Sequence, residues 1–465
     1  MLSDIRWTRE AIAYQIFPDR FCRGASSRIP ESAERWGSKP TARGFMGGNL
    51  SGITRRLDYL EELGVNLLYL TPIFESPSNH GYDTSDYYTV EPRLGSEKDL
   101  QILLSLAHAR GMRILLDGVF NHCGRGFVPF RDVLENGFRS RYRDWFHFYR
   151  FPASDEGSHE YRAFQDAPGM PVFNLRNPET REFLLEVGQY WTRQGIDGWR
   201  LDAVGESEDR VFWREFRRVV KAVNPRAYII AEIWKGGGEE DAFDGVTNYP
   251  LRETMLEFFL RRSIRASHFA ASVDRLFSDL TRSSVPAMFN IVGSHDTERI
   301  MTLAGGDLDR VMLIHLFLFC CPGVPAVYYG DEIGLEGGKD PDNRRAMSWD
   351  PRTWNHDLWE FTRRLIAVRR SVDPLRHGDW RTLFADDKES VCAFLKRADG
   401  RAAVVVVSSG DRPITVAIDL SACGLDTGTV LLNVMDGRIA NRTVSGRSLC
   451  TLRPRSGAIL IPDRE

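Results

Sequence analysis

Arg200 and Asp202 occur in a short apolar segment, residues 198–204, that is predicted to be a buried strand. Side chains two positions apart on a strand point the same way, so these two share one face. A nearby positive charge lowers the pKa of a carboxylate. Asp202 is therefore predicted to be an ionised, fixed nucleophile. For this pair alone, an ordinary ion pair at a strand end is an equal alternative.

Two later stretches favour a catalytic role for Asp202 over an ordinary ion pair. Glu232 closes an apolar segment, and His295 and Asp296 stand together further along the chain. Two carboxylates flanking a glycosidic bond equip a glycosidase, because one attacks the anomeric carbon while the other protonates the leaving oxygen and later activates water. The acid needs a pocket with an apolar wall, which Ile233 and Trp234 would give Glu232. Asp296 supplies a third carboxylate that can stabilise positive charge on the sugar ring.

Alternating strands and helices would position these groups. Strands are expected at 11–17, 65–70, 113–120, 198–204, 228–234, 244–249, 287–292 and 324–329. Helices are expected at about 53–63, 96–110, 178–194, 212–223, 250–281 and 355–371. This pattern predicts an α/β fold, a closed parallel (β/α)8 TIM barrel, whose chemistry lies at the C-terminal ends of its strands.

Polar side chains gather at those expected strand ends. Packing explains such a set poorly, because buried unpaired charges cost several kcal/mol each. The set comprises Tyr82, Asp83, Asn121, His122, Asp202, Glu232, His295 and Asp296.

The alternation breaks twice. Residues 123–173 are aromatic and basic without a regular period, which predicts a lobe inserted after the third strand. Short strands with turn signals at 402–407, 414–420, 430–434 and 458–461 predict an all-β sandwich domain over 374–465. The barrel then comprises 1–122 and 174–373.

The composition is that of a globular protein with a large core. Of 465 residues, 42% are apolar and 27% charged, and the net charge of −3 argues against binding to nucleic acid or an anionic membrane. No secretory leader is visible at the N-terminus, and no apolar run reaches membrane-spanning length. The seven scattered cysteines include no Cys-x-x-Cys pair, so neither a disulfide framework nor a zinc site is expected. A cytoplasmic protein with reduced thiols is the expectation.

Four stretches resemble the characteristic blocks of the α-amylase family, in the right order and spacing. They are Asp117-Gly-Val-Phe-Asn-His122, Gly198-Trp-Arg-Leu-Asp202, Glu232-Ile-Trp234 and Asn290-Ile-Val-Gly-Ser-His-Asp296. Segments 14–21, 36–40, 45–50, 76–80 and 331–334 resemble the cyclomaltodextrinase, neopullulanase and maltogenic amylase subfamily. A subfamily member that opens cyclic maltosyl-maltose has a similar short layout.

The resemblance implies a role for each candidate. Asp202 would be the nucleophile, Glu232 the general acid/base and Asp296 the transition-state stabiliser that grips ring hydroxyls. Arg200 would orient Asp202, while Asp117 and Asn121 would be structural supports. Substrate binding is implied for Tyr82, which would stack under the sugar, for His122, His295 and Arg344 with Asp340 beside it, and for Trp234 and Phe173, for which plain packing is an equal alternative.

The implied activity is retaining hydrolysis of short or cyclic maltooligosaccharides, with α-1,4 bonds and optionally α-1,6 bonds. The α-glucan oligosaccharide is the expected partner, and the preferred glucan stays open because residues 170–174 and 235–238 depart from the subfamily pattern. The alternatives are a transglycosylase or isomerase of the same family, and a non-catalytic binding relative. The presence of all three candidate acids argues against the non-catalytic alternative.

No organic cofactor is implied. Calcium is not favoured, because the loop at 22–29 offers no carboxylate before Glu31 and calcium prefers several oxygen ligands. The sequence is expected to begin directly at the barrel, without the N-terminal β domain through which members of the resembled subfamily dimerise. The oligomeric state therefore stays open, with a homodimer as one option.

Overall fold

The computed structural model describes residues 5–24, 29, 32–151, 160–207, 209–234, 241–278, 287–421, 428–444 and 446–463. Eight short parallel strands form the central sheet: β1 (Ala13–Ile16), β2 (Leu67–Leu70), β5 (Arg113–Gly118), β6 (Gly198–Leu201), β7 (Tyr228–Ala231), β8 (Gly245–Val246), β9 (Phe289–Asn290) and β10 (Val324–Tyr328). They follow the order β8-β7-β6-β5-β2-β1-β10-β9. A parallel bridge between Thr247 and Phe289 joins the two ends, so the sheet is a nearly closed barrel.

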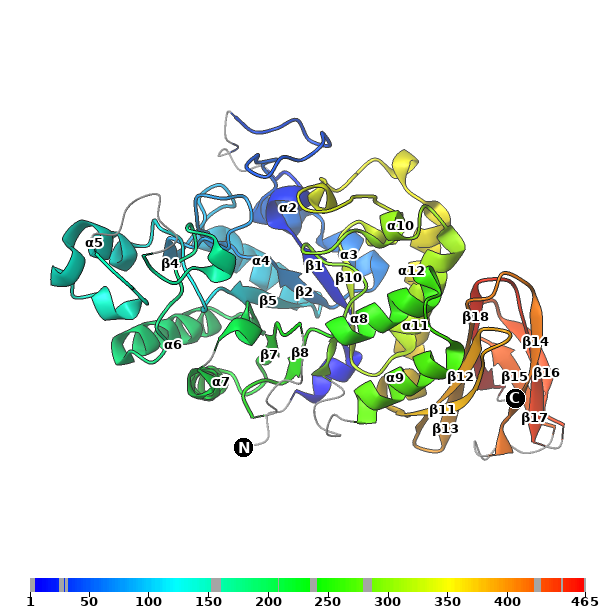
Figure 1. Cartoon of the computed structure of the whole chain (residues 1–465). Coiled ribbons are helices and arrows are strands. Elements are labelled where there is room, and N and C mark those ends of the chain that lie inside the picture. Colours follow the sequence, from blue (N-terminus) through cyan, green and yellow to red (C-terminus); the bar gives the residue numbers. More distant parts are fainter. Residues whose placement is uncertain are drawn as a thin grey trace.

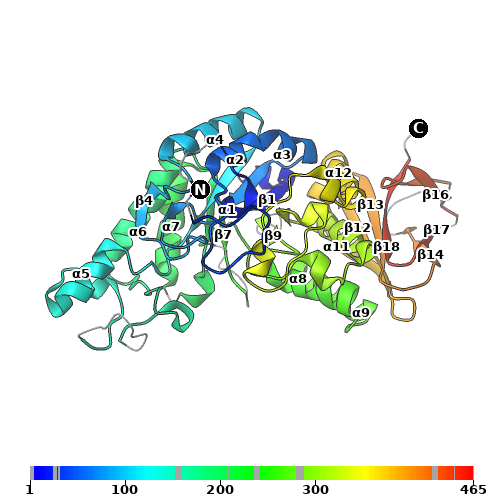
Figure 2. The ribbon, with the colours of Figure 1, turned by 90° about the horizontal axis from the view of Figure 1, so that it is seen from above.

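Helices surround this barrel, as the view from above shows (Figure 2). They are α1 (Pro18–Phe21), α2 (Leu50–Arg55), α3 (Leu57–Leu63), α4 (Glu97–Ala109), α6 (Pro178–Arg193), α7 (Arg210–Val223), α8 (Tyr249–Met255), α9 (Ala266–Ser278), α10 (Ile300–Leu303), α11 (Leu308–Cys320) and α12 (His356–Ser371).

Local sequence explains where helices begin, end and pack. Ser96 and Asp99 form a capping box at the start of α4. Gly64 ends α3 in the left-handed conformation, with φ of 92°, which glycine adopts without steric cost. In α7, Phe212 and Phe216 lie on the buried face, and Phe216 packs against Trp199 of β6. The side of β6 opposite the site is thus fixed by apolar packing.

An inserted lobe follows β5 and lies at the end of the molecule opposite the C-terminal sheets (Figure 1). It contains α5 (Val128–Asn136) and a core of aromatic rings, in which Phe130 packs edge-to-face against Phe146 and Tyr161. A bridge between His122 and Val172 ties the lobe to the end of β5. A second excursion, the hairpin of β3 (Phe74–Glu75) and β4 (Asp86–Val90), follows β2.

The C-terminal part is all-β after the short helix α13 (Asp373–His377). Its strands are β11 (Asp379–Asp386), β12 (Val391–Ala398), β13 (Arg401–Ser408), β14 (Ile414–Asp419), β15 (Val430–Asn433), β16 (Arg438–Arg442), β17 (Arg447–Leu452) and β18 (Ser456–Pro462). They form a six-stranded sheet and a two-stranded sheet of β14 and β17. Phe394 packs against Phe269 of α9 and Phe317 of α11, so the larger sheet rests on barrel helices.

The predicted fold class is confirmed: a parallel barrel with a lobe after its third strand and an antiparallel β domain at the C-terminus. Details differ. The helix expected at 53–63 is two helices, α2 and α3, and the sixth and seventh barrel strands shrink to two residues each. The prediction missed four C-terminal strands, β11, β12, β16 and β17, as well as α13. The exact domain limits remain predictions.

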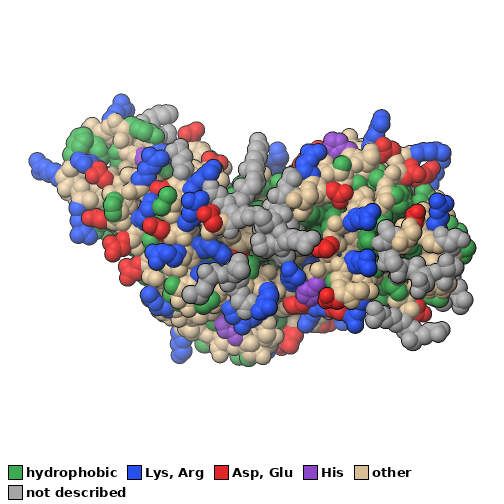
Figure 3. All heavy atoms as spheres, turned by 90° about the horizontal axis from the view of Figure 1, so that it is seen from below, with side chains coloured by type: hydrophobic (Ala, Val, Ile, Leu, Met, Phe, Trp, Pro, Cys, Tyr) green, Lys and Arg blue, Asp and Glu red, His purple; other side chains and the backbone are tan. Residues whose placement is uncertain are grey.

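Two surface findings bear on partners. Within the described parts of the chain, none of the helices combines the length and the apolar character needed to cross a membrane. On the face seen in Figure 3, basic and acidic side chains are interspersed. Among the described side chains, that face therefore presents no continuous basic patch of the kind that tracks a phosphate backbone.

Candidate active site

A cleft of about 770 Å³ opens at the C-terminal ends of the barrel strands and beneath the lobe. Its size falls in the range of small-molecule sites. The side chains that line it come from several strand ends, from the loop before β4 and from the lobe: His80, Tyr82, His122, Phe164, Gln165, Met170, Asp202, Ala203, Gly205, Glu206, Glu232, Trp234, Asp296, Asp340 and Arg344.

Asp202 follows β6 and is only 6% exposed. Arg200, two residues earlier on the same face of the strand, donates from Nη1 to Asp202 Oδ1 at 2.9 Å. The other oxygen, Oδ2, has no hydrogen-bond partner among the residues described. His122 Nδ1 lies 4.0 Å from it. One oxygen of Asp202 is therefore anchored, while the other is buried at the cleft and has no hydrogen-bond partner in the described chain.

The prediction that Arg200 keeps the pKa of Asp202 low is wrong. Burial raises the pKa of Asp202 well above its ordinary value, against the opposing charge of Arg200. The reason is that one guanidinium serves three carboxylates. Arg200 also pairs with Asp117 at 2.9 Å and with Glu232 at 2.8 Å. Its single charge does not offset the burial of Asp202 and Asp117, whose pKa values are both raised.

Glu232 follows β7, and both of its oxygens are held. Oε1 accepts from Arg200 Nη2 at 2.8 Å and from Trp234 Nε1 at 3.2 Å. Oε2 accepts from the backbone N–H of Ala203 at 2.8 Å. Ala203 has a left-handed backbone, with φ of 51°, and such strain in a residue other than glycine is typical of functional sites. The turn after β6 thus aims an N–H at the carboxylate of the neighbouring strand.

Asp296 lies on the other side of the cleft, after β9. Its Oδ2 is 3.2 Å from His295 Nε2, and its Oδ1 is 3.6 Å from Arg344 Nη2. Arg344 also pairs with Asp340 at 3.2 Å and donates from Nε to the carbonyl of His295 at 2.9 Å. Burial raises the pKa of Asp296, while Arg200 and Arg344 oppose the effect.

The rings of His122 and Phe164 lie together in the lining of the cleft. His122 is fully buried, and its ring stacks on Phe164 of the lobe at a centroid distance of 4.5 Å. Burial lowers the pKa of His122 to about 3, so the ring is neutral near neutral pH. Its Nε2 lacks a hydrogen-bond partner within the described chain. A neutral ring with one unused nitrogen suits a sugar hydroxyl.

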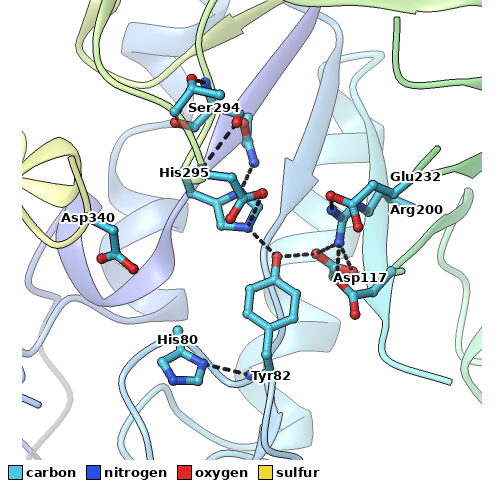
Figure 4. A network of polar contacts seen from close by, with 12 residues as sticks. His80, Tyr82, Asp117, Arg200, Glu232, Ser294, His295 and Asp340 are labelled. Atoms are coloured by element: carbon cyan, nitrogen blue, oxygen red, sulfur yellow. Dashed lines mark hydrogen bonds and ion pairs between the residues drawn. The ribbon is translucent and has the colours of Figure 1, made fainter. Parts of the chain in front are cut away.

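Tyr82 joins the two sides of the site through its hydroxyl (Figure 4). The hydroxyl lies 2.8 Å from Asp117 Oδ2 and 2.5 Å from His295 Nε2. His80 stacks on the Tyr82 ring, which in turn stacks on His295. Tyr82 is therefore a fixed wall of the cleft.

The structure brings together eight of the predicted site residues in the cleft lining: Tyr82, His122, Asp202, Glu232, Trp234, Asp296, Asp340 and Arg344. Arg200 and His295 lie directly behind it, 3% and 2% exposed, and contact the acids. Asp117 and Asn121 are buried. Asp117 accepts hydrogen bonds from Arg200, which fits its predicted supporting role.

The implied role of Phe173 in substrate binding is corrected by the structure. Phe173 is 2% exposed, packs against Phe146 and Phe127 in the lobe and is not among the cleft residues. Its neighbour in sequence, Met170, lines the cleft instead. The chain turns through the bridges of the lobe between these positions, and this buries Phe173 in the ring cluster.

Seven lining residues were not among the predicted site residues: His80, Phe164, Gln165, Met170, Ala203, Gly205 and Glu206. His80 lies in a loop whose polar and aromatic content was a usable signal. Phe164 and Gln165 lie in the lobe, where no periodicity shows which side chains face the barrel.

No group of three or more His, Cys, Asp or Glu side chains in the described ranges is placed to hold a metal ion. Most of the loop examined for calcium, residues 25–28, lies outside those ranges, as do Glu31 and residues 235–238. The cleft acids themselves are held by Arg200 and Arg344 rather than left open as a ligand set.

Known proteins are similar to this chain in both sequence and fold. The α-amylase catalytic domain profile matches residues 15–382. Cyclomaltodextrinase from Geobacillus thermopakistaniensis (strain MAS1) is 41% identical over 459 residues, 98% of this chain and 77% of that protein. Neopullulanase 2 from Thermoactinomyces vulgaris is 42% identical over 460 residues, 98% of this chain and 78% of that protein.

A solved structure agrees with these relatives. The cyclic α-maltosyl-(1→6)-maltose hydrolase from Arthrobacter globiformis, in complex with cyclic α-maltosyl-(1→6)-maltose, superposes with a TM-score of 0.90 at 37% identity. The match covers 98% of this chain and 99% of that chain.

Proposed function

Because this chain belongs to the α-amylase family of glycoside hydrolases, we propose that it cleaves α-glucosidic bonds in short or cyclic maltooligosaccharides with retention of configuration. Asp202 acts as the nucleophile, Glu232 as the general acid/base and Asp296 as the stabiliser of the transition state. The observation that carries the proposal is that all three carboxylates line one cleft of sugar-binding size.

In the first displacement, Oδ2 of the ionised form of Asp202 attacks the anomeric carbon while the bond to the leaving oxygen breaks and that oxygen takes a proton from the protonated form of Glu232. In the second, Glu232 removes a proton from water, and the water oxygen replaces Asp202 at the same carbon. The geometry supports this division, because Arg200 anchors Oδ1 of Asp202 and leaves Oδ2 without a partner among the described residues.

Retention requires the two carboxyl groups to lie close together, about 5–5.5 Å apart. Asp202 and Glu232 both contact one guanidinium, that of Arg200, at 2.9 and 2.8 Å. A shared partner of this size holds the pair near each other. This arrangement favours a retaining over an inverting reaction, which needs room for a water molecule.

The sugar ring in the cleaved position would lie on Tyr82, with an apolar ring face against an aromatic one. His122 Nε2 would donate to a hydroxyl, and Asp296 with Arg344 would hold hydroxyls on the opposite edge. These groups surround the acids in the cleft lining. Their common feature is that hydrogen-bonding atoms converge where the ring would lie.

We infer the substrate class from the proteins to which this chain is similar. They include a cyclomaltodextrinase, a neopullulanase and a hydrolase crystallised with cyclic α-maltosyl-(1→6)-maltose. We assign this chain α-1,4-linked maltooligosaccharides, linear or cyclic, with α-1,6 bonds as a further substrate. A panel of linear, branched and cyclic α-glucans, with products resolved by size, tests the assignment.

Transfer to a sugar acceptor is a second candidate activity. Trp234 is 50% exposed at the cleft and stacks on Tyr249 with a centroid distance of 3.7 Å. A half-exposed, braced indole beside the acid/base can hold an acceptor sugar. Adding glucose as acceptor is expected to yield transfer products in the wild type and fewer in Trp234→Ala. Equal transfer in both proteins would contradict this role of Trp234.

The catalytic assignment is tested with Asp202→Asn and Glu232→Gln. Each is expected to lower kcat by about 10³-fold or more without changing the circular dichroism spectrum. Asp58→Asn is the matched control, because the Asp58 side chain is 84% exposed on α3. Near-wild-type turnover by either cleft variant would overturn the assignment.

We also place the enzyme in the cytoplasm. The six cysteines that the structure describes are all buried and free of disulfides, as expected for reduced thiols. No cofactor is needed for the proposed reaction, since two carboxylates and water supply every bond change.

A further inference from the structure

Gln15 is a polar residue in β1, enclosed and 3% exposed. It pairs in register with Tyr69 of β2 and Tyr328 of β10. Its Nε2 lies 2.7 Å from His295 Nδ1, on the side of the imidazole away from the cleft. Within the described chain, the hydrogen-bond partner of this buried amide is His295, the histidine behind the acids.

We propose that Gln15 is a positioning residue that fixes the tautomer of His295, so that Nε2 carries the ring proton and Nδ1 accepts. Gln15 does not line the cleft, and it would act on catalysis only through His295. The inference rests on the proposed function for its catalytic consequence. The tautomer itself follows from the hydrogen-bond network.

The first step concerns Asp117, which is surrounded by donors. Tyr69 donates to its Oδ2 at 2.6 Å, and Arg200 donates to both oxygens at 2.9 and 3.0 Å. Tyr82 lies 2.8 Å from Oδ2. A carboxylate that receives an arginine and a tyrosine proton serves as an acceptor. The single hydroxyl proton of Tyr82 is therefore directed to Asp117.

The second step concerns the other contact of Tyr82. Its hydroxyl oxygen lies 2.5 Å from His295 Nε2. Because the hydroxyl proton is used on Asp117, the oxygen can only accept in this contact, so Nε2 must bear a hydrogen. Asp296 Oδ2, also an acceptor, is 3.2 Å from the same nitrogen. Two acceptors face Nε2, and a bare nitrogen there would repel both.

The third step concerns the charge of His295. Burial lowers its pKa well below the ordinary value, and the charges of Arg344 and Arg200 add to the effect. A neutral imidazole has one ring proton. With that proton on Nε2, Nδ1 is bare and needs a donor, which the Gln15 amide supplies. An amide keeps its protons at every pH, so the tautomer is held across the working range.

As a consequence, the hydrogen bonds behind the site all run in one direction. Gln15 donates to His295, His295 donates to Tyr82, and Tyr82 donates to Asp117 (Figure 4 shows the last two contacts). Asp117 in turn shares Arg200 with Asp202. Loss of the Gln15 donor would let the ring proton move to Nδ1, and the wall formed by Tyr82 and Asp296 would lose its N–H donor.

The test is nitrogen NMR of protein labelled with ¹⁵N in the histidine rings, with His295 assigned by comparison with a His295→Asn variant. The wild type is expected to show the Nε2–H tautomer from pH 5.5 to 8.5. An Nδ1–H tautomer or an imidazolium in the wild type would overturn the proposal. This reading needs no substrate, so it stands apart from any failure of the proposed function.

Two variants extend the test. Gln15→Leu removes the donor and is expected to mix the tautomers and lower kcat about tenfold or more, with little change in KM. Gln15→Glu replaces the donor by a carboxyl group that accepts once it is ionised and is then expected to put the ring proton on Nδ1, so that its kcat falls as pH rises and recovers at low pH, where the protonated carboxyl group can donate. The charged groups facing His295 are Arg344, Arg200, Glu232, His80 and Asp296, and both variants leave them in place.

Gln101→Leu is the matched control, because Gln101 on α4 also donates from its amide but does so to Gln194 near the surface. It is expected to match the wild type in kcat and in the His295 signals. A purely structural role for Gln15 predicts the same pH-independent loss in both variants with unchanged His295 signals, and this outcome would refute the proposal. If Gln15→Glu does not fold, the wild-type spectrum and Gln15→Leu still decide.

Discussion

Lys396 in β12 is expected to destabilise the folded protein at neutral pH. It is fully buried, and its Nζ has no hydrogen-bond partner among the described residues. The ring of Trp380 lies 5.9 Å away. Burial, with the nearby charge of Arg369, lowers the pKa of Lys396 from 10.5 to about 7. The perturbation is Lys396→Met, which keeps the length of the side chain without its charge.

The sign follows from proton binding. Between about pH 7 and pH 10.5 the unfolded chain keeps a proton on Lys396 that the folded chain has released. Stability therefore rises with pH across this window in the wild type. Each pKa unit is worth about 1.4 kcal/mol, so Lys396→Met is expected to gain about 4 kcal/mol at pH 7 and about 1.4 kcal/mol less with each further pH unit.

Urea unfolding followed by tryptophan fluorescence at pH 6.5, 8 and 9.5 measures the difference. Lys388→Met is the matched control, since the Lys388 side chain is 89% exposed in the turn before β12. The control should change little and without pH dependence. A Lys396→Met variant that is less stable than the wild type, or whose gain does not shrink with pH, would refute the reasoning.

Three further outcomes are expected. Arg200→Met leaves three buried carboxylates without their shared cation and should lower the free energy of unfolding by about 3–5 kcal/mol, measured in urea; an unchanged midpoint would contradict this. Phe173→Leu should cost about 1–2 kcal/mol of stability but leave KM unchanged, because the ring packs in the lobe; a raised KM would restore it as a substrate contact. Treatment with EDTA should alter neither activity nor the thermal midpoint, and a loss of either would reveal a bound metal.

The fold was predictable where apolar runs are continuous. Strands buried on both faces, such as β2 and β7, read as uninterrupted apolar segments. Strands β11 and β16 were missed, because charged and polar residues dominate their sequences. Sequence pattern reports burial and period, and β11, in which no residue is fully buried, offers little of either.

The acids were predictable because each stands at the end of an apolar strand. The electrostatics were not, because the number of carboxylates sharing Arg200 depends on which strands are neighbours. Residues two apart suggested one ion pair, whereas the barrel brings Asp117 and Glu232 to the same guanidinium.

The lobe and the layer behind the site were the least predictable parts. Phe164 reaches the cleft and Phe173 does not, although both lie in the same irregular aromatic segment. Gln15 carried a usable signal, since it is the one polar residue in the apolar stretch 11–17. A polar side chain in a strand buried on all sides needs a partner, and here the partner is His295.

The most direct measurement is the identification of the residue that becomes covalently bound to sugar. The enzyme is incubated with 5-fluoro-α-glucosyl fluoride, which slows the second displacement, and peptides are analysed by mass spectrometry. The account predicts one glycosyl adduct, on Asp202, that is absent from Asp202→Asn. An adduct on another carboxylate, or hydrolysis that releases the β-anomer first, would contradict it.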